Sequence, residues 1–190
     1  MVGRAGGGAA ADDAELVGHA LAGRQTGYAG LMERHRGAVF RLARGHVGTE
    51  DDALDITQEC FISAFAALHR YDPARPFRAW LLRIALNKCH DWARRRAVRR
   101  FFAFARPLED AFDVADSAPG PEAALASAAE VARIQQAIAA LPAALKEPLI
   151  LCSIEGMEQE AAAALLGISR KAVETRIYRA RQKLGQALEG

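Results

Sequence analysis

The sequence predicts an all-α protein of two small helical domains joined by a flexible acidic linker. Helix-forming residues dominate the 190-residue chain, and no long β-branched run indicates a sheet. Apolar residues recur at helical spacing on both sides of a proline-bearing acidic segment that has no period of its own. The expected divisions are a disordered tail (1–11), a first domain (12–104), the linker (105–121) and a second domain (122–190).

In the first domain, the predicted helices begin at capping residues and end at glycines or prolines. Asp12 and Asp13 are expected to cap a short helix that ends at Gly23, and a second helix is expected over 26–45. Thr49 is expected to cap a third helix, whose first turn is acidic and which reaches about Leu68. A proline-braced loop then separates it from a fourth helix, 77–100. The residues expected to be buried on the third and fourth helices are Ala53, Ile56, Cys60, Phe61, Ala64, Phe65, Leu68, Phe77, Trp80, Leu81, Ile84 and Ala85.

The second domain carries the pattern of a helix-turn-helix. Helices are expected over 122–141 and from Pro142 to about Glu155, with Pro148 close to the first turn of the latter. A short helix, 158–166, is followed by the turn Gly167-Ile168, and Ser169 caps a basic helix that runs to about Leu188. The residues expected to be buried there are Ala162, Ala163, Leu166, Ile168, Val173 and Ile177.

Charge is separated along the chain, although the net charge is only +2. The stretch from Arg83 to Arg100 carries +6, and the stretch from Pro107 to Glu130 carries −6. Such blocks indicate separate partners: a polyanion for the basic part, and a basic surface or channel for the acidic part.

Several classes of function are disfavoured by what the sequence lacks. It shows no nucleophile grouping, metal-ligand set or glycine-rich phosphate loop, so we expect no enzyme activity, no cofactor and no small-molecule substrate. Cys89-His90 is too small a set for a metal site. Three scattered cysteines indicate reduced thiols in the cytoplasm. No apolar run reaches the length of a membrane span, and Met1–Ala11 lacks the core of a signal peptide.

The helix after Ser169 is a candidate reader of duplex DNA, since the second helix of this motif enters the major groove. Arginine can read guanine, glutamate can accept from the cytosine amino group, and threonine can donate or accept. Three further basic residues, Arg176, Arg181 and Lys183, are better placed for phosphates. The alternative is a solvated basic helix on a protein-binding domain. The candidate reading residues are Arg170, Lys171, Glu174, Thr175, Tyr178 and Arg179.

The helix 77–100 combines aromatic side chains with an arginine run. Trp80 and Trp92 could stack on bases of a single strand, but the apolar stripe favours a core position for Trp80. The basic residues could neutralise several phosphates or form a solvated face. On the preceding helix, the polar face of Asp52, Asp55 and their neighbours Gln58 and Glu59 is by itself no more than a solvated surface.

Two blocks of sequence resemble the extracytoplasmic-function (ECF) group of the sigma-70 family. Residues 55–61 (DITQECF) and 71–87 (YDPARPFRAWLLRIALN) resemble sigma region 2. Leu141-Pro142, 155–157 (EGM), 167–169 (GIS) and 178–181 (YRAR) resemble sigma region 4. Within region 4, the segments KAVE (171–174) and RI (176–177) are similar to sigma factors that regulate heavy-metal resistance. Glu174 departs from the family, in which this position is commonly basic.

The resemblance implies roles that residue chemistry leaves open. The partners would be core RNA polymerase, through its β′ clamp and β subunit, promoter DNA, and an anti-sigma factor that is usually membrane-anchored. The acidic linker would thread a basic channel of the polymerase toward the RNA exit path. Polymerase contacts would come from Asp52, Asp55, Gln58 and Glu59. The minus-ten element would be held by Arg70, Tyr71, Arg75, Arg78, Asn87, Lys88, Asp91, Arg94, Arg95 and Arg96. The minus-thirty-five element would be held by Arg170, Lys171, Glu174, Thr175, Arg176, Tyr178 and Arg179.

Three rival functions remain open at this stage. A stand-alone helix-turn-helix regulator would bind an operator without polymerase, but it leaves the block 71–87 unexplained. A nuclease would need a carboxylate or metal cluster. A helical adaptor would touch no DNA.

Overall fold

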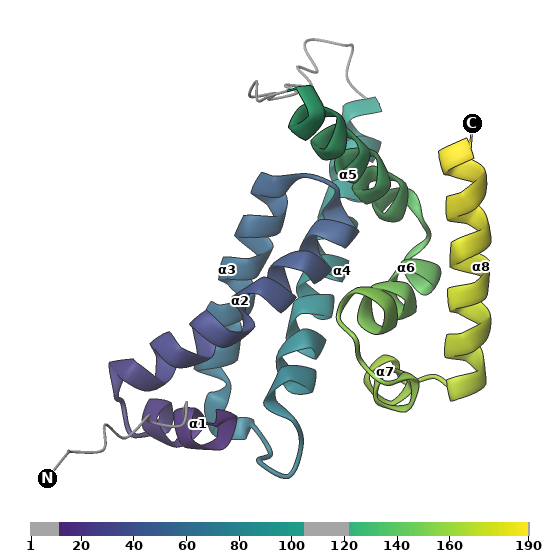
Figure 1. Cartoon of the computed structure of the whole chain (residues 1–190). Helices are drawn as coiled ribbons and strands as arrows, with labels where there is room; N and C mark the ends of the chain where they lie inside the picture. Colours follow the sequence, from purple (N-terminus) through teal and green to yellow (C-terminus); the bar gives the residue numbers. More distant parts are fainter. Residues whose placement is uncertain (1–11, 105–121, 190) are drawn as a thin grey trace, which may run out of the picture.

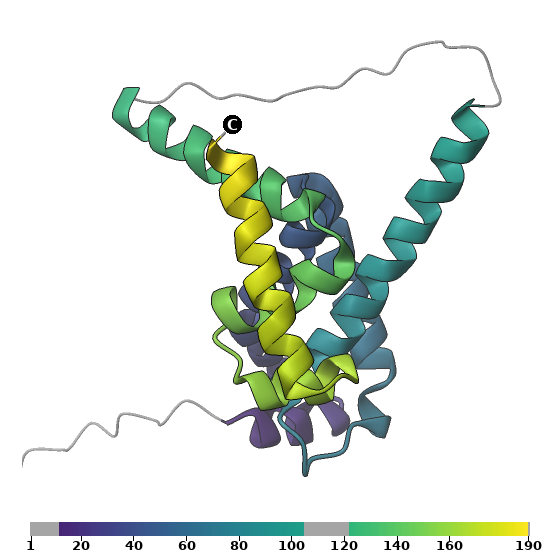
Figure 2. The same ribbon diagram turned by 90° about the vertical axis from the view of Figure 1, so that its right-hand side faces the viewer.

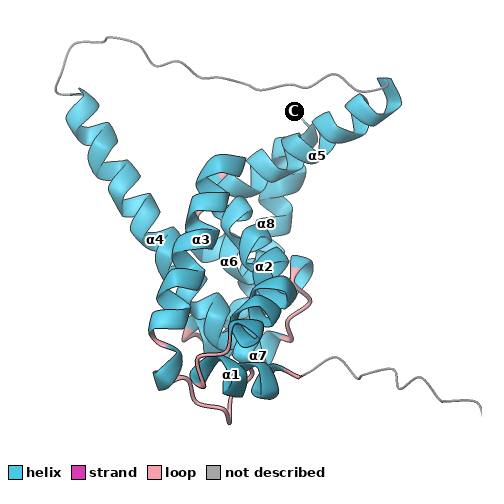
Figure 3. Ribbon diagram, turned by 90° about the vertical axis from the view of Figure 1, so that its left-hand side faces the viewer, coloured by secondary structure: helices cyan, strands magenta, loops and turns pink. Residues whose placement is uncertain are grey.

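The regular elements of the computed structural model are all helical over the residues that it describes, 12–104 and 122–189 (Figures 1 and 3). The predicted tail, 1–11, and linker, 105–121, lie outside the described residues. The α-helices are α1 (Asp13–Leu21), α2 (Gln25–Val47), α3 (Glu50–Ala66), α4 (Phe77–Phe104), α5 (Glu122–Ala140), α6 (Ala143–Leu149), α7 (Gln159–Leu166) and α8 (Arg170–Glu189). A 3-10 turn, η1 (Leu68–Arg70), follows α3, and a π-helix, η2 (Ile150–Ile154), follows α6.

The helix ends follow local capping chemistry. Asp12 Oδ1 accepts a hydrogen bond from the backbone N of Glu15 at 2.8 Å, and Ser169 Oγ accepts one from the backbone N of Ala172 at 3.2 Å. Both satisfy amides that a helix start leaves without partners, as predicted. Thr49 also stands at a helix start, but its hydroxyl donates to Asp52 Oδ2 at 2.5 Å rather than capping the backbone.

The N-terminal unit, α1 to α4, is built around α2, which packs against α1, α3 and α4 (Figure 1). Nine of the twelve predicted core residues of α3, η1 and α4 are buried, and the other three, Phe65, Trp80 and Ile84, are partly buried and pack against the same core. Phe65 packs at the cluster edge against Tyr28, with ring centroids 4.9 Å apart. The apolar stripes therefore form the core of this unit.

The C-terminal unit, α5 to α8, contains the helix-turn-helix. Gly167 has a φ of +68°, a left-handed conformation that ends α7 and redirects the chain into α8. Val173 and Ile177 of α8 are buried, as predicted. Leu166 and Ile168, which were also predicted to be buried, are only partly buried, and Leu165 is buried instead. The motif thus forms with its predicted bounds.

Pro148 departs from the prediction, because it is the sixth residue of α6 rather than part of its first turn. A proline removes one backbone donor from the helix ladder. The chain continues as the π-helix η2, in which the backbone N of Glu155 bonds to the Ile150 carbonyl at 2.9 Å. This π-helical turn begins directly after Pro148, which has no backbone N–H to donate. It is followed by Gly156, whose φ is +65°.

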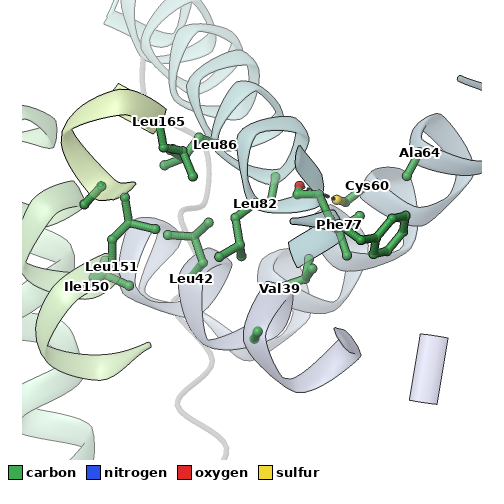
Figure 4. Close-up of a cluster of buried hydrophobic side chains, with 14 of the residues drawn as sticks. Val39, Leu42, Cys60, Ala64, Phe77, Leu82, Leu86, Ile150, Leu151 and Leu165 are labelled. Carbon is green, nitrogen blue, oxygen red and sulfur yellow. Dashed lines mark hydrogen bonds between the residues drawn. The ribbon is translucent and has the colours of Figure 1, made fainter. Parts of the chain in front are cut away.

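The two units share one hydrophobic cluster (Figure 4). Leu42 of α2 and Leu82 of α4 lie beside Ile150 and Leu151 of η2, all four 0% exposed. Gly45 makes this approach possible, since a Cβ there would lie 2.6 Å from Ile150 Cδ1. The two domains expected from sequence are therefore packed against each other.

The C-terminal part of α4 projects away from this body (Figures 2 and 3). All side chains from residue 93 to residue 102 are exposed, among them Phe101 and Phe102 at 74% and 63%.

Candidate polymerase and promoter contacts

The polar side chains predicted on one face of α3 divide into two sets. Asp55 and Gln58 are exposed, on the side that faces away from α4. Asp52 and Glu59 are half-buried and face α4. Glu59 lies 3.5 Å from Arg95 and 3.9 Å from Lys88. Only Asp55 and Gln58 are therefore fully available to another protein in this structure.

Asp55 and Gln58 border a groove between α2 and α3 of about 610 Å³. Three large apolar side chains at the groove, Met32, Leu54 and Ile62, are 40%, 45% and 62% exposed. Apolar surface rimmed by polar groups is typical of a protein-binding site. The sequence analysis did not predict these apolar residues as part of the site. Their position on the otherwise polar side of α2 and α3 could have indicated it.

The loop between η1 and α4 is held by an aromatic cluster. The Tyr71 ring packs against Phe77 and Trp80, with centroids 5.4 and 5.3 Å away, and its hydroxyl donates to the Arg75 carbonyl at 2.5 Å. Arg70 is exposed, and the Arg75 side chain is 80% exposed. The aromatic cluster of Tyr71, Phe77 and Trp80 thus holds the loop, and the side chains of Arg70 and Arg75 extend from it into solvent. Trp80 belongs to this cluster and is only partly buried, so its packing agrees with the core interpretation over the stacking one.

Arg78, predicted to contact the minus-ten element, instead binds the C-terminal unit. Its Nη2 donates to Glu155 Oε2 at 2.6 Å and to the Glu155 carbonyl at 2.8 Å. The same carboxylate accepts two hydrogen bonds from Arg41, at 2.8 and 3.0 Å, and its side chain is 0% exposed. The carboxylate also raises the pKa of Arg41 above its ordinary value. We call these three residues the Glu155 bridge.

Further along α4, the predicted minus-ten residues spread around the solvent-facing part of the helix, where Lys88 and Asp91 are partly buried. Asn87 is exposed, Lys88 and Arg95 reach toward Glu59, and Arg94 pairs with Asp91 within the helix. Surface pairs of this kind contribute little stability and are exchanged readily for other partners. This part of the helix therefore remains able to meet a phosphate backbone.

Trp92 joins α4 to the start of α3. Its indole N–H donates to Asp52 Oδ1 at 3.0 Å, its ring packs against the buried cluster around Ala43 and Val47, and Arg96 lies over the ring at 5.1 Å. This packing gives Trp92 a structural role, since an indole held by its N–H and by a core cannot rotate toward a base. A small basic pocket lies at this junction and is lined by Asp52, Trp92, Arg96, Arg99 and Arg100.

The second helix of the helix-turn-helix, α8, presents its polar side to solvent. Lys171 and Arg170 lie 3.3 and 3.6 Å from Glu174, and the Thr175 hydroxyl donates to the Lys171 carbonyl at 2.9 Å. Tyr178 is 63% exposed and accepts a hydrogen bond from Gln182 at 2.9 Å, while Arg179 is exposed. Arg176 is half-buried. Four of the seven predicted residues are thus exposed, while Glu174 and Thr175 are half-buried like Arg176, and Glu174 is held by two cations.

A second set of polar contacts between the units was also missed by sequence reasoning. Lys146 is buried and donates to the carbonyl of His46 at 3.2 Å and to that of Ala139. Burial lowers the pKa of Lys146. His90 Nε2 lies 2.6 Å from Glu147 Oε1. Charged residues inside the apolar segment 145–151 were the available signal, because such residues are buried only with partners.

Neither a metal centre nor a membrane span is found in the described parts of the chain. No group of three potential ligands from His, Cys, Asp and Glu gathers within 12–104 and 122–189. Among the helices of those residues, none has the length and apolar character required to cross a bilayer.

Comparison with known proteins agrees with this architecture. The family model for sigma-70 region 2 matches residues 31–99, and that for sigma-70 region 4 matches residues 132–184. The RNA polymerase sigma factor CnrH of Cupriavidus metallidurans is 43% identical over 93% of this chain and 94% of its own length. NccH of Alcaligenes xylosoxydans xylosoxydans is 41% identical over 93% and 95%. A solved structure of CnrH in complex with the cytosolic domain of CnrY has a TM-score of 0.68, with 37% identity, over 93% of this chain and 97% of that one. The chain belongs to the sigma-70 family of RNA polymerase sigma factors and is a member of its ECF group.

Proposed function

We propose that this sigma factor holds a promoter at two points. In this proposal the C-terminal unit reads the minus-thirty-five element as duplex DNA through α8. The N-terminal unit captures bases of the opened minus-ten strand through the loop 70–78 and α4. Neither unit needs to bind tightly alone, because docking both on one polymerase raises their effective concentration.

The exposed side of α8 supports the first contact. Arg170, Lys171 and Arg179 can donate to guanine or to phosphates, and Arg176 is placed for the backbone. Thr175 and Tyr178 add hydroxyl groups. Glu174 would accept a hydrogen bond from a cytosine amino group once Arg170 and Lys171 bind phosphates instead of its carboxylate.

The aromatic base of the loop 70–78 supports the second contact. A base that leaves the stack needs a rigid pocket with polar edges. Arg70, Arg75 and the Tyr71 cluster provide a rigid basic loop. Asn87 and Asp91 would line the same strand, and the basic residues Lys88, Arg94, Arg95 and Arg96 would follow its phosphates.

The α2–α3 groove is the proposed polymerase contact. Asp55 and Gln58 would meet the β′ clamp beside the apolar residues of the groove, and Asp52 and Glu59 would contribute from its α4 side. A second contact with the β subunit would be made by the C-terminal unit.

Regulation and location are proposed from the family. An anti-sigma factor, membrane-anchored as is usual in the family, would cover the polymerase and DNA surfaces; the relative CnrH was solved with the cytosolic domain of CnrY bound. The protein would act in the cytoplasm as a regulatory binding protein without an enzymatic reaction of its own. Its target promoters would belong to heavy-metal resistance, as the resemblance of 171–177 suggests.

Run-off transcription with core polymerase on genomic fragments tests the proposal. Start sites that appear only with the protein are expected, and they reveal the promoter. Arg179→Ala and Asn87→Ala should each reduce these transcripts by about 5- to 150-fold, since each removes a base contact of about 1–3 kcal/mol. Arg24→Ala, at an exposed arginine that belongs to neither proposed DNA contact, should not reduce them. Unchanged start sites with and without the protein would refute the proposed function.

A further inference from the structure

The loop 70–78 is fixed to the N-terminal unit mainly at its two ends. Residues 72–76 between them are all exposed, so their own side chains do little to hold the loop in place. Tyr71 near the start of the loop and Phe77 near its end pack against each other, with ring centroids 5.4 Å apart. Phe77 is 2% exposed. The position of the loop therefore depends on the side chains that fix the ring of Phe77.

One of these side chains, His35 of α2, is itself held by α1. His35 is 4% exposed, and its ring centroid lies 5.2 Å from that of Phe77. Its Nε2 lies 3.0 Å from Asp13 Oδ1 of α1. Burial acts to raise the pKa of Asp13, but hydrogen bonds from Arg34 and His35 lower it below its ordinary value, so this carboxyl is ionised at neutral pH. An ionised carboxylate can only accept, so His35 Nε2 carries the hydrogen and donates it.

The first helix is also close to the other end of the loop. It contacts η1 and lies at the same end of the N-terminal unit as the loop (Figures 1 and 2). Burial, together with the negative charges of Asp13 and Asp72, raises the pKa of Tyr71 above its ordinary value. Asp13 therefore favours the protonated Tyr71 hydroxyl, which donates to the Arg75 carbonyl. One carboxylate of α1 thus acts on both ends of the loop.

We propose that His35 is a positioning residue for capture of the minus-ten strand. Asp13 fixes the imidazole ring, the ring fixes Phe77, and Phe77 with Tyr71 fixes the loop that would hold the flipped base. The hydrogen bond at one ring nitrogen sets the tautomer and orientation of a histidine, so without Asp13 the ring is free to turn against Phe77. This inference rests on the proposed function and gives α1 a part in it, although no residue of α1 contacts DNA there.

Two substitutions in the full chain remove this hydrogen bond from opposite sides. Asp13→Ala removes the acceptor. His35→Phe removes the donor but keeps an aromatic ring beside Phe77. Glu15→Ala, at an exposed carboxyl residue of the same helix, is the matched control. Circular dichroism first establishes that each variant is folded, and His35→Phe remains informative if Asp13→Ala is not.

Hydrogen exchange of the free protein measures the loop without DNA. The amides of Tyr71 and Arg75 donate to the carbonyls of Leu68 and Asp72, at 3.0 Å each. In both variants these two amides should exchange about tenfold faster, while the amides of α8 keep the wild-type rate.

Binding of the reconstituted holoenzyme to two DNA probes measures the effect on function. The first probe is forked DNA with a single-stranded minus-ten element, whose sequence run-off transcription provides. Its affinity should fall about tenfold in both variants if the loop then holds its capture-competent position for about a tenth of the time. The second probe, a duplex minus-thirty-five fragment, should bind within about twofold of the wild-type affinity, because α8 reads it without the loop.

A double substitution separates positioning from a loss of stability. Tyr71→Ala removes the ring through which His35 would act. Adding His35→Phe to Tyr71→Ala should therefore lower the minus-ten affinity no further than Tyr71→Ala does alone. A side chain that only stabilises the fold would lower the affinity by the same factor in both backgrounds.

Wild-type loop exchange and wild-type minus-ten affinity in both variants would overturn the inference. So would the same loss in Glu15→Ala, an equal loss on the two DNA probes, or an additive loss in the Tyr71→Ala background. If the wild type directs initiation, each of these results removes only the role of His35. If the wild type directs no initiation with core polymerase, the proposed function fails, and this inference fails with it.

Discussion

Acid should destabilise this protein through His46, which lies between the two units. Burial, together with the positive charge of Lys146 and of His90, lowers the pKa of His46 from 6.5 to about 3. Its Nε2 is buried and has no hydrogen-bond partner. The folded protein therefore keeps this imidazole neutral where the unfolded chain would protonate it.

The size and sign of the effect follow from this difference in pKa. As pH falls below 6.5, the unfolded state binds a proton that the folded state does not bind until about pH 3, so stability falls with pH. Each pH unit in this window costs about 1.4 kcal/mol. Between pH 7.5 and pH 5.0, His46 alone should remove about 2 kcal/mol from the free energy of unfolding.

Urea unfolding at the two pH values measures this loss. His46→Leu replaces the imidazole by an apolar side chain that does not titrate, and its loss between pH 7.5 and 5.0 should be about 2 kcal/mol smaller than that of the wild type. His69→Gln, at an exposed histidine of η1, should lose as much as the wild type. Equal losses in the wild type and in His46→Leu would show that the folded protein protonates His46 as easily as the unfolded chain does.

Two further predictions concern packing and thiol access. Gly27→Ala should lower the free energy of unfolding by about 2–3 kcal/mol in urea titrations, since its Cβ would lie 2.3 Å from the backbone N of Ala20. Gly18→Ala, where a Cβ meets nothing within 4 Å, should instead raise it by about 0.5–1 kcal/mol, and a loss in both variants would contradict the steric reason. A thiol reagent at pH 8 should modify Cys152 first and the other two cysteines only on unfolding, because burial raises the pKa of Cys60 and Cys89 to about 12; three equal rates in the native protein would refute this order.

The helices could be predicted from sequence because their signals are local. Asp12, Ser169 and Gly167 act on residues within four positions, so the chain near each of them contains the whole cause. The all-α class and the helix-turn-helix followed in the same way. Pro148 was misplaced because the π-helix that follows it depends on packing as well as on the missing donor.

The relation between the units could not be predicted, because it depends on contacts across long sequence separations. Glu155 lies 77 and 114 positions from Arg78 and Arg41. The helical period shows which side of α3 is polar. It does not show that Asp52 and Glu59 bind Trp92 and Arg95 of α4 and are therefore less accessible to a partner protein. Family resemblance supplied the expected roles of these residues, and the structure shows which of them are accessible.

The exposed C-terminal end of α4 affects how stable its last turns are as a helix. From residue 93 to residue 102 every side chain is exposed, although Arg95 pairs with Glu59 of α3, and an isolated helix of under three turns is marginal in water. Five arginines in this stretch repel one another at low ionic strength. An anion that neutralises them would therefore favour the helical state over the frayed one, and helix formation in these turns would become part of the free energy of nucleic-acid binding.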